Sequence, residues 1–299
     1  MRERSVTFGT GGALCGILAE PSAFRPGAPA VVLSNVGMHT RIGPNRMWVL
    51  LARELAAQGY LVLRFDLSGF GESEIRAVTL SDVDRAAEEQ RMAVAFLVER
   101  LGAAAVVLVG FCSGVDGVHV ASLADPRVAG VFYLDGYAYP TSKFYQLRWR
   151  ARLLRPSLWR SFVVRRVTRL RELFRGEPKH APPIFDRTYP PPARLASDLR
   201  GLVTRGVKLL LVWSEGRAHE FNHADQFFSM LEAEDLRGKV DVRILDRCDH
   251  LFSSESQRSL LFGLFRRWLD VHFAPAPSGK PARAPAGPPA KAEPSGVAG

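Results

Sequence analysis

The sequence predicts an α/β protein with one mostly parallel central sheet and helices on both of its faces. Short, wholly apolar runs such as residues 28–33 and 105–109 are typical of strands that are buried on both faces. Longer stretches between them carry one apolar stripe, which is typical of surface helices. Strands that alternate with helices along a chain form parallel sheets, so the order of these segments indicates the architecture.

The expected elements follow from these patterns in chain order. Residues 5–8 and 14–19 form a hairpin around a cluster of glycines. The helix at residues 46–58 is preceded by Pro44, and Ser81 is a suitable N-cap for the helix at residues 82–101. Strands are expected at residues 28–33, 61–65, 105–109, 128–134, 208–213 and 240–245. Helices are expected at residues 46–58, 82–101, 115–123, 224–234 and 256–271.

Two segments interrupt the alternation. Residues 137–206 contain many prolines and no clear strand, and we interpret them as a helical cap insertion over the sheet. Residues 274–299 have no large apolar side chain except Val297, so burial cannot offset the entropy lost on ordering them. The predicted organisation is an α/β core made of residues 1–136 and 207–273, a cap insertion, and a disordered tail.

Length and composition restrict the location of the protein. The chain has 299 residues and three cysteines, an odd number that does not suggest a disulfide framework. The N-terminus has no apolar stretch of the kind found in signal peptides. No apolar run reaches the roughly 18 residues that a membrane-spanning helix needs. We therefore expect a cytoplasmic protein.

The segment Gly110-Phe111-Cys112-Ser113-Gly114 carries the strongest functional signal. It lies between a buried strand and a helix, which is the setting of a nucleophile elbow. In such a turn, small residues on either side allow the nucleophile to adopt a strained backbone and to project above the sheet. The spacing of the glycines places Cys112, not Ser113, at the nucleophile position. A helix N-terminus here would also lower the pKa of a thiol.

A base and an acid should accompany this nucleophile. His250 lies on a short loop after the strand at residues 240–245, where this arrangement places its histidine. Three carboxylates compete for the acid position. Glu215, just after the strand at residues 208–213, is narrowly favoured, and Asp135, at the end of the strand at residues 128–134, is next. Glu220 lies further along the loop of Glu215.

The oxyanion that forms during acyl transfer needs two hydrogen-bond donors. The backbone N–H of Ser113, at the start of the predicted helix, is the first candidate. The second should come from the loop after the strand at residues 28–33, and the backbone N–H of Met38 is the candidate there.

With these motifs, the sequence resembles a group of bacterial α/β-hydrolases. This group is similar to the serine-aminopeptidase-type and dienelactone-hydrolase-type branches. The similarity covers about residues 25–135 and 205–270 and says little about the insertion. Some members of this group carry cysteine in the elbow. The resemblance implies the α/β-hydrolase fold and its reaction type, with Cys112 and His250 carried over, but Arg217 occupies the place of the expected aspartate. It rests on residues 33–37, 41–46, 63–73, 110–114 and 248–250.

A second pattern points to a different chemistry. His219-Glu220-Phe221-Asn222-His223 matches His-Glu-x-x-His, in which two histidines on one face of a helix bind zinc. Here the pattern directly follows a predicted strand, and a third ligand would have to be Glu232 or Glu234. We interpret the match as coincidence, so no metal and no other cofactor is expected. A zinc metallopeptidase remains the alternative that this pattern would support.

The net charge of +10 is concentrated in one stretch. Residues 143–175 contain ten arginines and Lys143, while Glu172 is their one acid, and apolar residues are interleaved with them. Such a cap could lie on anionic lipid as a peripheral membrane contact, or gather an anionic substrate. The alternative is a solvated face with ordinary packing beneath it. Nucleic acid is not expected as a partner, because no recognition module accompanies the charge.

Taken together, these residues predict a hydrolase or acyl transferase that acts on an ester or a thioester. Cys112 would attack the carbonyl carbon, His250 would be the base, and Glu215 or Asp135 would orient the imidazole. The substrate would be a small acyl compound, and an anionic or carrier-bound one is among the alternatives. The competing hypothesis is a non-catalytic or weakly active binding protein built on the same scaffold.

Overall fold

The protein has a single mixed sheet at its centre. The structure is a computed structural model that describes residues 1–35, 37, 39–153 and 187–273. Its eight-stranded sheet has the order β1-β2-β4-β3-β5-β6-β7-β8. β1 and β2 are antiparallel, β2 is antiparallel to β4, and every other neighbouring pair is parallel. The predicted mostly parallel sheet is confirmed.

The strands agree with the sequence-based expectation, with ends that shift by a few residues. All positions of β3, β4 and β5 are buried, as expected of central strands that are covered on both faces. The bounds are β1 Arg2–Phe8, β2 Leu14–Glu20, β3 Ala30–Leu33, β4 Val62–Phe65, β5 Val106–Phe111, β6 Val128–Leu134, β7 Lys208–Ser214 and β8 Asp241–Leu245.

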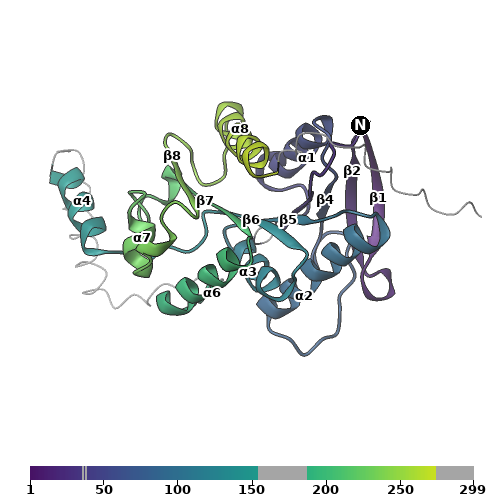
Figure 1. Cartoon of the computed structure of the whole chain (residues 1–299), viewed down its shortest axis with the longest axis horizontal. Coiled ribbons are helices and arrows are strands. Elements are labelled where there is room, and N and C mark those ends of the chain that lie inside the picture. Colours follow the sequence, from purple (N-terminus) through teal and green to yellow (C-terminus); the bar gives the residue numbers. More distant parts are fainter. Residues whose placement is uncertain (36, 38, 154–186, 274–299) are drawn as a thin grey trace, which may run out of the picture.

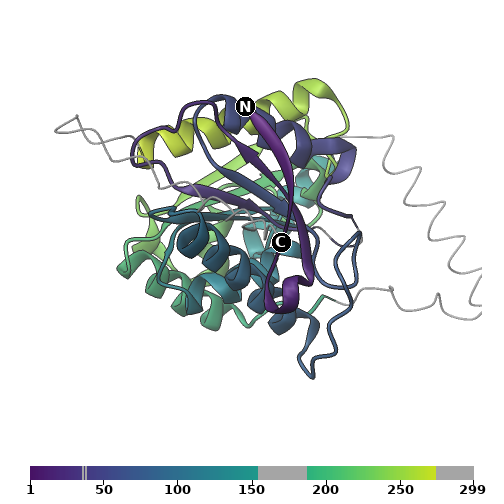
Figure 2. The same ribbon diagram turned by 90° about the vertical axis from the view of Figure 1, so that its right-hand side faces the viewer.

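Helices form one layer on each side of the sheet (Figures 1 and 2). α1 Met47–Ala57 and α8 Glu255–His272 pack on one face around Trp48 and Phe265. The other face is covered by α2 Asp82–Ala95, α3 Gly114–Ala124, α6 Pro192–Thr204 and α7 Gln226–Leu231. The short helical segments are Thr10–Gly12, Pro44–Arg46, Phe96–Arg100, Glu215–Arg217 and Glu234–Leu236.

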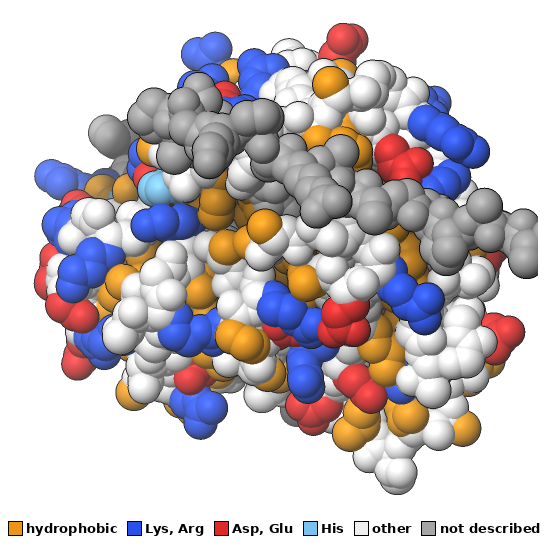
Figure 3. Space-filling model, turned by 45° about the vertical axis from the view of Figure 1, so that its right-hand side comes forward, with side chains coloured by type: hydrophobic (Ala, Val, Ile, Leu, Met, Phe, Trp, Pro, Cys, Tyr) orange, Lys and Arg blue, Asp and Glu red, His pale blue; other side chains and the backbone are white. Residues whose placement is uncertain are grey.

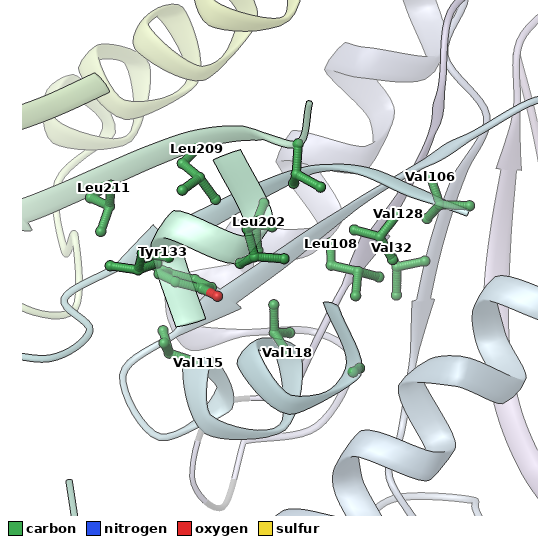
Figure 4. Close-up of a cluster of buried hydrophobic side chains, with 14 of the residues drawn as sticks. Val32, Val106, Leu108, Val115, Val118, Val128, Tyr133, Leu202, Leu209 and Leu211 are labelled. Atoms are coloured by element: carbon green, nitrogen blue, oxygen red, sulfur yellow. The ribbon is translucent and has the colours of Figure 1, made fainter. Parts of the chain in front are cut away.

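Helix α6 lies in the core layer, although the sequence grouped it with the insertion. Its residues Leu195, Leu199 and Leu202 are buried in the same hydrophobic cluster as α3 and the strands. Figure 4 shows Leu202 facing side chains of β5, β6 and β7, next to Val118 of α3. The prolines before it therefore mark the start of a core helix, because proline is well tolerated in the first turn.

Helix α4, Ser142–Leu153, lies in the segment that the sequence predicts to be a cap insertion. It lies near the loop before α7, where Asn222 Nδ2 donates a hydrogen bond to the Phe144 carbonyl. The helical stretch expected at residues 157–174 and the tail at residues 274–299 lie outside the described residues. Within the ranges that the structure describes, no helix is both long and apolar enough to cross a bilayer.

Candidate active site

The predicted elbow has a strained backbone in the structure. β5 ends at Phe111, α3 begins at Gly114, and Cys112 between them has a φ of 51°. A cysteine rarely adopts this left-handed conformation. The Cys112 N–H donates to the Leu134 carbonyl at 2.8 Å, and its own carbonyl accepts from the Val115 N–H at 3.1 Å. The turn thus has the strained backbone that the sequence pattern predicts for a nucleophile position.

The two glycines of the elbow are required by close backbone contacts. A Cβ atom on Gly110 would lie 2.8 Å from the Val115 Cα, and one on Gly114 would lie 2.2 Å from the Asn35 carbonyl oxygen. Neither neighbour is a flexible side chain that can move aside. The glycines allow α3 to start directly against β5 and against the loop that follows β3.

Strand register places Cys112 next to Asp135. Phe111 pairs with Leu134 across β5 and β6, so the residues that follow each strand are neighbours at the carboxyl edge of the sheet. Asp135 is fully buried and has a φ of 49°. Its carboxylate accepts hydrogen bonds from the Ser214 N–H and hydroxyl, both at 2.7 Å. Ser214, the last residue of β7, was not identified from the sequence.

His250 connects this carboxylate to the thiol. Its Nδ1 lies 2.7 Å from Asp135 Oδ2, and its imidazole also interacts electrostatically with Cys112. The ring packs on Phe111, with centroids 5.0 Å apart. The side chain keeps 30% of its surface exposed, so it remains accessible to a bound reactant. The imidazole of His250 thus lies between the Asp135 carboxylate and the Cys112 thiol, and it interacts with both.

Glu215 and Glu220, the other two carboxylate candidates, make different contacts. Glu215 Oε2 accepts a hydrogen bond from the Arg247 N–H at 2.6 Å, so it holds the loop that carries His250 rather than the imidazole. Glu220 pairs with Arg217. The structure therefore brings Asp135 to His250, whereas the sequence narrowly favoured Glu215. The strand order places Asp135, after β6, directly beside the end of β5, whereas the Glu215 carboxylate is held by the Arg247 N–H.

These interactions change the acidity of both Cys112 and His250. Burial disfavours the Cys112 thiolate, but the hydrogen bond and charge of His250, with the charges of Arg187 and Arg217, hold the pKa of Cys112 below that of an ordinary thiol. Burial alone would lower the pKa of His250, but Asp135 and Cys112 raise it to about 9. Both shifts favour a thiolate–imidazolium pair.

The candidate oxyanion donors lie on two segments. Ser113 directly precedes α3, so its N–H is at the helix N-terminus. The Ser113 hydroxyl accepts a hydrogen bond from the Gly37 N–H at 3.0 Å, which joins the elbow to the loop after β3. Met38, the second predicted donor, lies outside the described residues. Trp48 Nε1 holds the start of the same loop through the Ser34 carbonyl, at 2.8 Å.

The His-Glu-x-x-His segment does not form a helix. Its residues follow the short helical turn Glu215–Arg217 and precede α7, so His219 and His223 do not share a helical face. His219 Nε2 contacts Glu220 at 3.1 Å, and His223 Nδ1 contacts Asn222 at 3.0 Å. Across the described part of the chain, no group of three or more His, Cys, Asp or Glu side chains is arranged to hold a metal ion.

Comparison with protein families identifies the scaffold. A family model described as the alpha/beta hydrolase family matches residues 26–261, which is most of the chain. The chain belongs to the α/β-hydrolase family. This hydrolase matches no curated protein at a significant level. Its family membership confirms the fold that the elbow motif predicted.

Solved structures show the same fold at low sequence identity. An α/β serine hydrolase without a lid from Xanthomonas campestris is 14% identical, with a TM-score of 0.55, over 93% of this hydrolase and 98% of that chain. A dienelactone hydrolase from Anabaena variabilis is 17% identical, with a TM-score of 0.55, over 91% and 98%. The esterase domain of a Rhodothermus marinus protein is 19% identical, with a TM-score of 0.54, over 91% and 100%.

Proposed function

We propose that this hydrolase cleaves an ester or thioester with Cys112 as nucleophile, His250 as general base and acid, and Asp135 as the carboxylate that orients His250. One observation carries the proposal: Cys112, at a strained elbow, interacts with His250, whose Nδ1 lies 2.7 Å from the fully buried Asp135 carboxylate. Nucleophile, base and orienting acid in this order are the arrangement that activates a weak nucleophile.

Acylation follows from the charges at the site. The Cys112 thiolate attacks the carbonyl carbon, and the electron pair of the C=O bond moves to the oxygen. The N–H of Ser113, at the start of α3, can donate to this oxyanion. When the tetrahedral intermediate collapses, the bond to the alcohol or thiol breaks, and His250 gives its proton to the leaving group. The enzyme then carries an acyl thioester on Cys112.

Deacylation reverses the proton transfer. Neutral His250 takes a proton from water, and the resulting hydroxide attacks the acyl carbon. The C–S bond breaks, the carboxylic acid leaves, and the thiolate–imidazolium pair is restored. An alcohol or amine in place of water would give acyl transfer by the same steps. Asp135 accepts the hydrogen bond of Nδ1 throughout and keeps the other ring nitrogen directed at the thiol.

The substrate remains a prediction at the level of chemical class. Arg187 and Arg217 both act electrostatically on Cys112, but Arg187 is paired with Asp116 and Arg217 with Glu220. Their charges are therefore already balanced by carboxylates of this chain. A small acyl compound is compatible with the charges of the described site. The alternative, an anionic or carrier-bound substrate, would need basic residues of the insertion to bind it.

The test compares turnover of p-nitrophenyl esters and acyl thioesters by the wild type, Cys112→Ala and Ser113→Ala. Loss of the nucleophile should lower kcat by at least about a thousandfold. Ser113→Ala keeps the backbone N–H and removes only the acceptor for the Gly37 N–H, so its loss should be on the order of tenfold. Activity that survives in Cys112→Ala but not in Ser113→Ala would overturn the proposal. Mass spectrometry should detect the acyl group on Cys112.

A further inference from the structure

A partly buried arginine, Arg187, lies between the two halves of the candidate site. Arg187 Nε and Nη2 donate to the two carboxylate oxygens of Asp116, each at 2.7 Å, and Nη1 reaches the Gly136 carbonyl at 3.4 Å. The rings of Tyr137 and Tyr189 lie 5.0 Å and 4.8 Å from the guanidinium carbon. Five contacts thus fix the orientation of this side chain.

These contacts join the segments that carry the nucleophile and the acid. Asp116 is in the first turn of α3, four residues after Cys112, and Gly136 directly follows Asp135. A bidentate pair fixes direction as well as distance, because the guanidinium and the carboxylate are both planar. Desolvation cancels much of the attraction in a buried ion pair, so a large gain in stability is not its expected contribution.

We propose that Arg187 is a positioning residue that locks the start of α3 to the strand end carrying Asp135, and so keeps Cys112 aligned and ionised for attack. The inference rests on the proposed function, because alignment matters only if Cys112 reacts. It identifies a role for a residue on the segment that returns from the insertion to the core, a position that no motif marks.

The charge of Arg187 gives the proposal a second, electrostatic consequence. The groups that act on the Cys112 thiolate are His250 after β8, Arg187 and Arg217, while the Tyr189 hydroxyl is affected by Cys112 in turn. Asp135 lies behind His250, and Asp116 opposes Arg187. Removing the positive charge should therefore raise the pKa of Cys112, and removing the Asp116 charge should lower it.

The experiment measures the rate of Cys112 alkylation by iodoacetamide between pH 5 and pH 10, followed on the Cys112 peptide by mass spectrometry. We expect Arg187→Gln to move the midpoint upward by on the order of one pH unit, and Asp116→Asn to move it downward. Opposite shifts from the two halves of one ion pair cannot result from general loosening of the fold, which would affect both variants alike. Turnover by Arg187→Gln should fall on the order of tenfold or more through kcat.

Arg205, at the end of α6, provides a matched control that contacts the other end of α3. Its Nη1 donates to the Ser122 and Leu123 carbonyls and its Nη2 to the Asp125 carbonyl, so it ties the opposite end of α3 to the protein. Arg205→Gln should lower the free energy of unfolding while leaving the alkylation midpoint of Cys112 unchanged. A shift of the midpoint in Arg205→Gln equal to that in Arg187→Gln would overturn the proposal.

Arg187→Lys keeps the charge but loses the bidentate geometry. It should retain a low alkylation midpoint and still lose kcat, and it serves as the test if Arg187→Gln does not fold. An unchanged midpoint and unchanged kcat in folded Arg187 variants would show that the residue is only structural. Failure of the proposed function can be told apart from failure of this proposal. If the proposed function is wrong, the wild type will not turn over the ester or thioester, whatever the alkylation midpoints are.

Discussion

At the scale of single residues, the position of His250 determines the expected pH dependence. Its imidazole lies between a buried carboxylate and a thiol, and these two partners raise the pKa of His250 to about 9. The Cys112 pKa moves in the opposite direction, below that of an ordinary thiol. Between the two values the thiolate and the imidazolium coexist, so this interval is the pH range in which the proposed chemistry is possible.

We expect kcat/KM for an alkyl ester to follow a bell-shaped pH profile. As the pH falls through the lowered Cys112 pKa, the nucleophile is protonated; as it rises through about 9, His250 loses the proton that the leaving alkoxide needs. Asp135→Asn removes a charge that raises the His250 pKa, so the alkaline limb should move to lower pH. Glu215→Gln is the control, because Glu215 contacts Arg247 instead. An alkaline limb that shifts in Glu215→Gln but not in Asp135→Asn would contradict this assignment.

The same residues show what the sequence could predict about the site. The elbow could be located because glycine spacing and a strand–helix boundary are local features, and His250 because it follows the last strand. Which carboxylate reaches His250 depends on which strands are neighbours and in what register they pair. No short stretch of sequence shows either of these. Arg187 has no local signal, since its partner Asp116 lies 71 residues away in the chain.

At the scale of secondary structure elements, the junction between β5 and α3 is the most constrained part of the chain. The helix begins so close to the strand and to the Asn35 carbonyl that two glycines are the only residues without a clash there. Close approach of backbones, rather than unusual torsion angles, explains Gly110 and Gly114. Only Cys112 between them has a positive φ.

A substitution at Gly114 should therefore be costly, and one at Gly201 should be favourable. In Gly114→Ala the new Cβ would lie 2.2 Å from the Asn35 carbonyl oxygen, so α3 or the loop must move, at a cost of about 1–3 kcal/mol and with loss of turnover. Gly201 is in α6 with no atom within 4 Å of a Cβ, so Gly201→Ala should stabilise the protein by about 0.5–1 kcal/mol. Urea unfolding measures the change in stability of both variants, and ester turnover measures the loss of activity in Gly114→Ala. Equal stabilities for the two variants would refute this view of the junction.

Most elements could be predicted because their apolar pattern is periodic or continuous. Helix α6 could not be assigned to the core from the sequence, since three prolines precede or begin it and suggest an irregular insertion. Its buried leucines recur at helical spacing, and that was the signal available. The helix predicted at residues 224–234 is shorter in the structure, where α7 ends at Leu231 because Glu232 has a φ of 48°.

At the scale of the whole molecule, the distribution of charge matters more than the net value of +10. On the face shown in Figure 3, Lys and Arg side chains are interspersed with Asp and Glu. Elsewhere in the described chain, too, basic and acidic side chains are paired, as Arg200 is with Asp235. The excess of arginine lies instead in residues 143–175. The described part of that stretch, α4, exposes about half the surface of Tyr145 and of Trp149, which lie one helical turn apart.

Aromatic side chains beside basic ones are suited to the headgroup region of an anionic membrane. We expect the protein to sediment with vesicles that contain phosphatidylserine at low salt, and to be released in about 0.5 M NaCl as the Debye length shortens to a few ångströms. Tyr145→Ser with Trp149→Ser should weaken sedimentation, whereas Leu260→Ser with Val271→Ser, two exposed positions on α8, should not. Equal binding to neutral vesicles, or binding that salt does not reduce, would show that the arginines of this stretch serve a different partner.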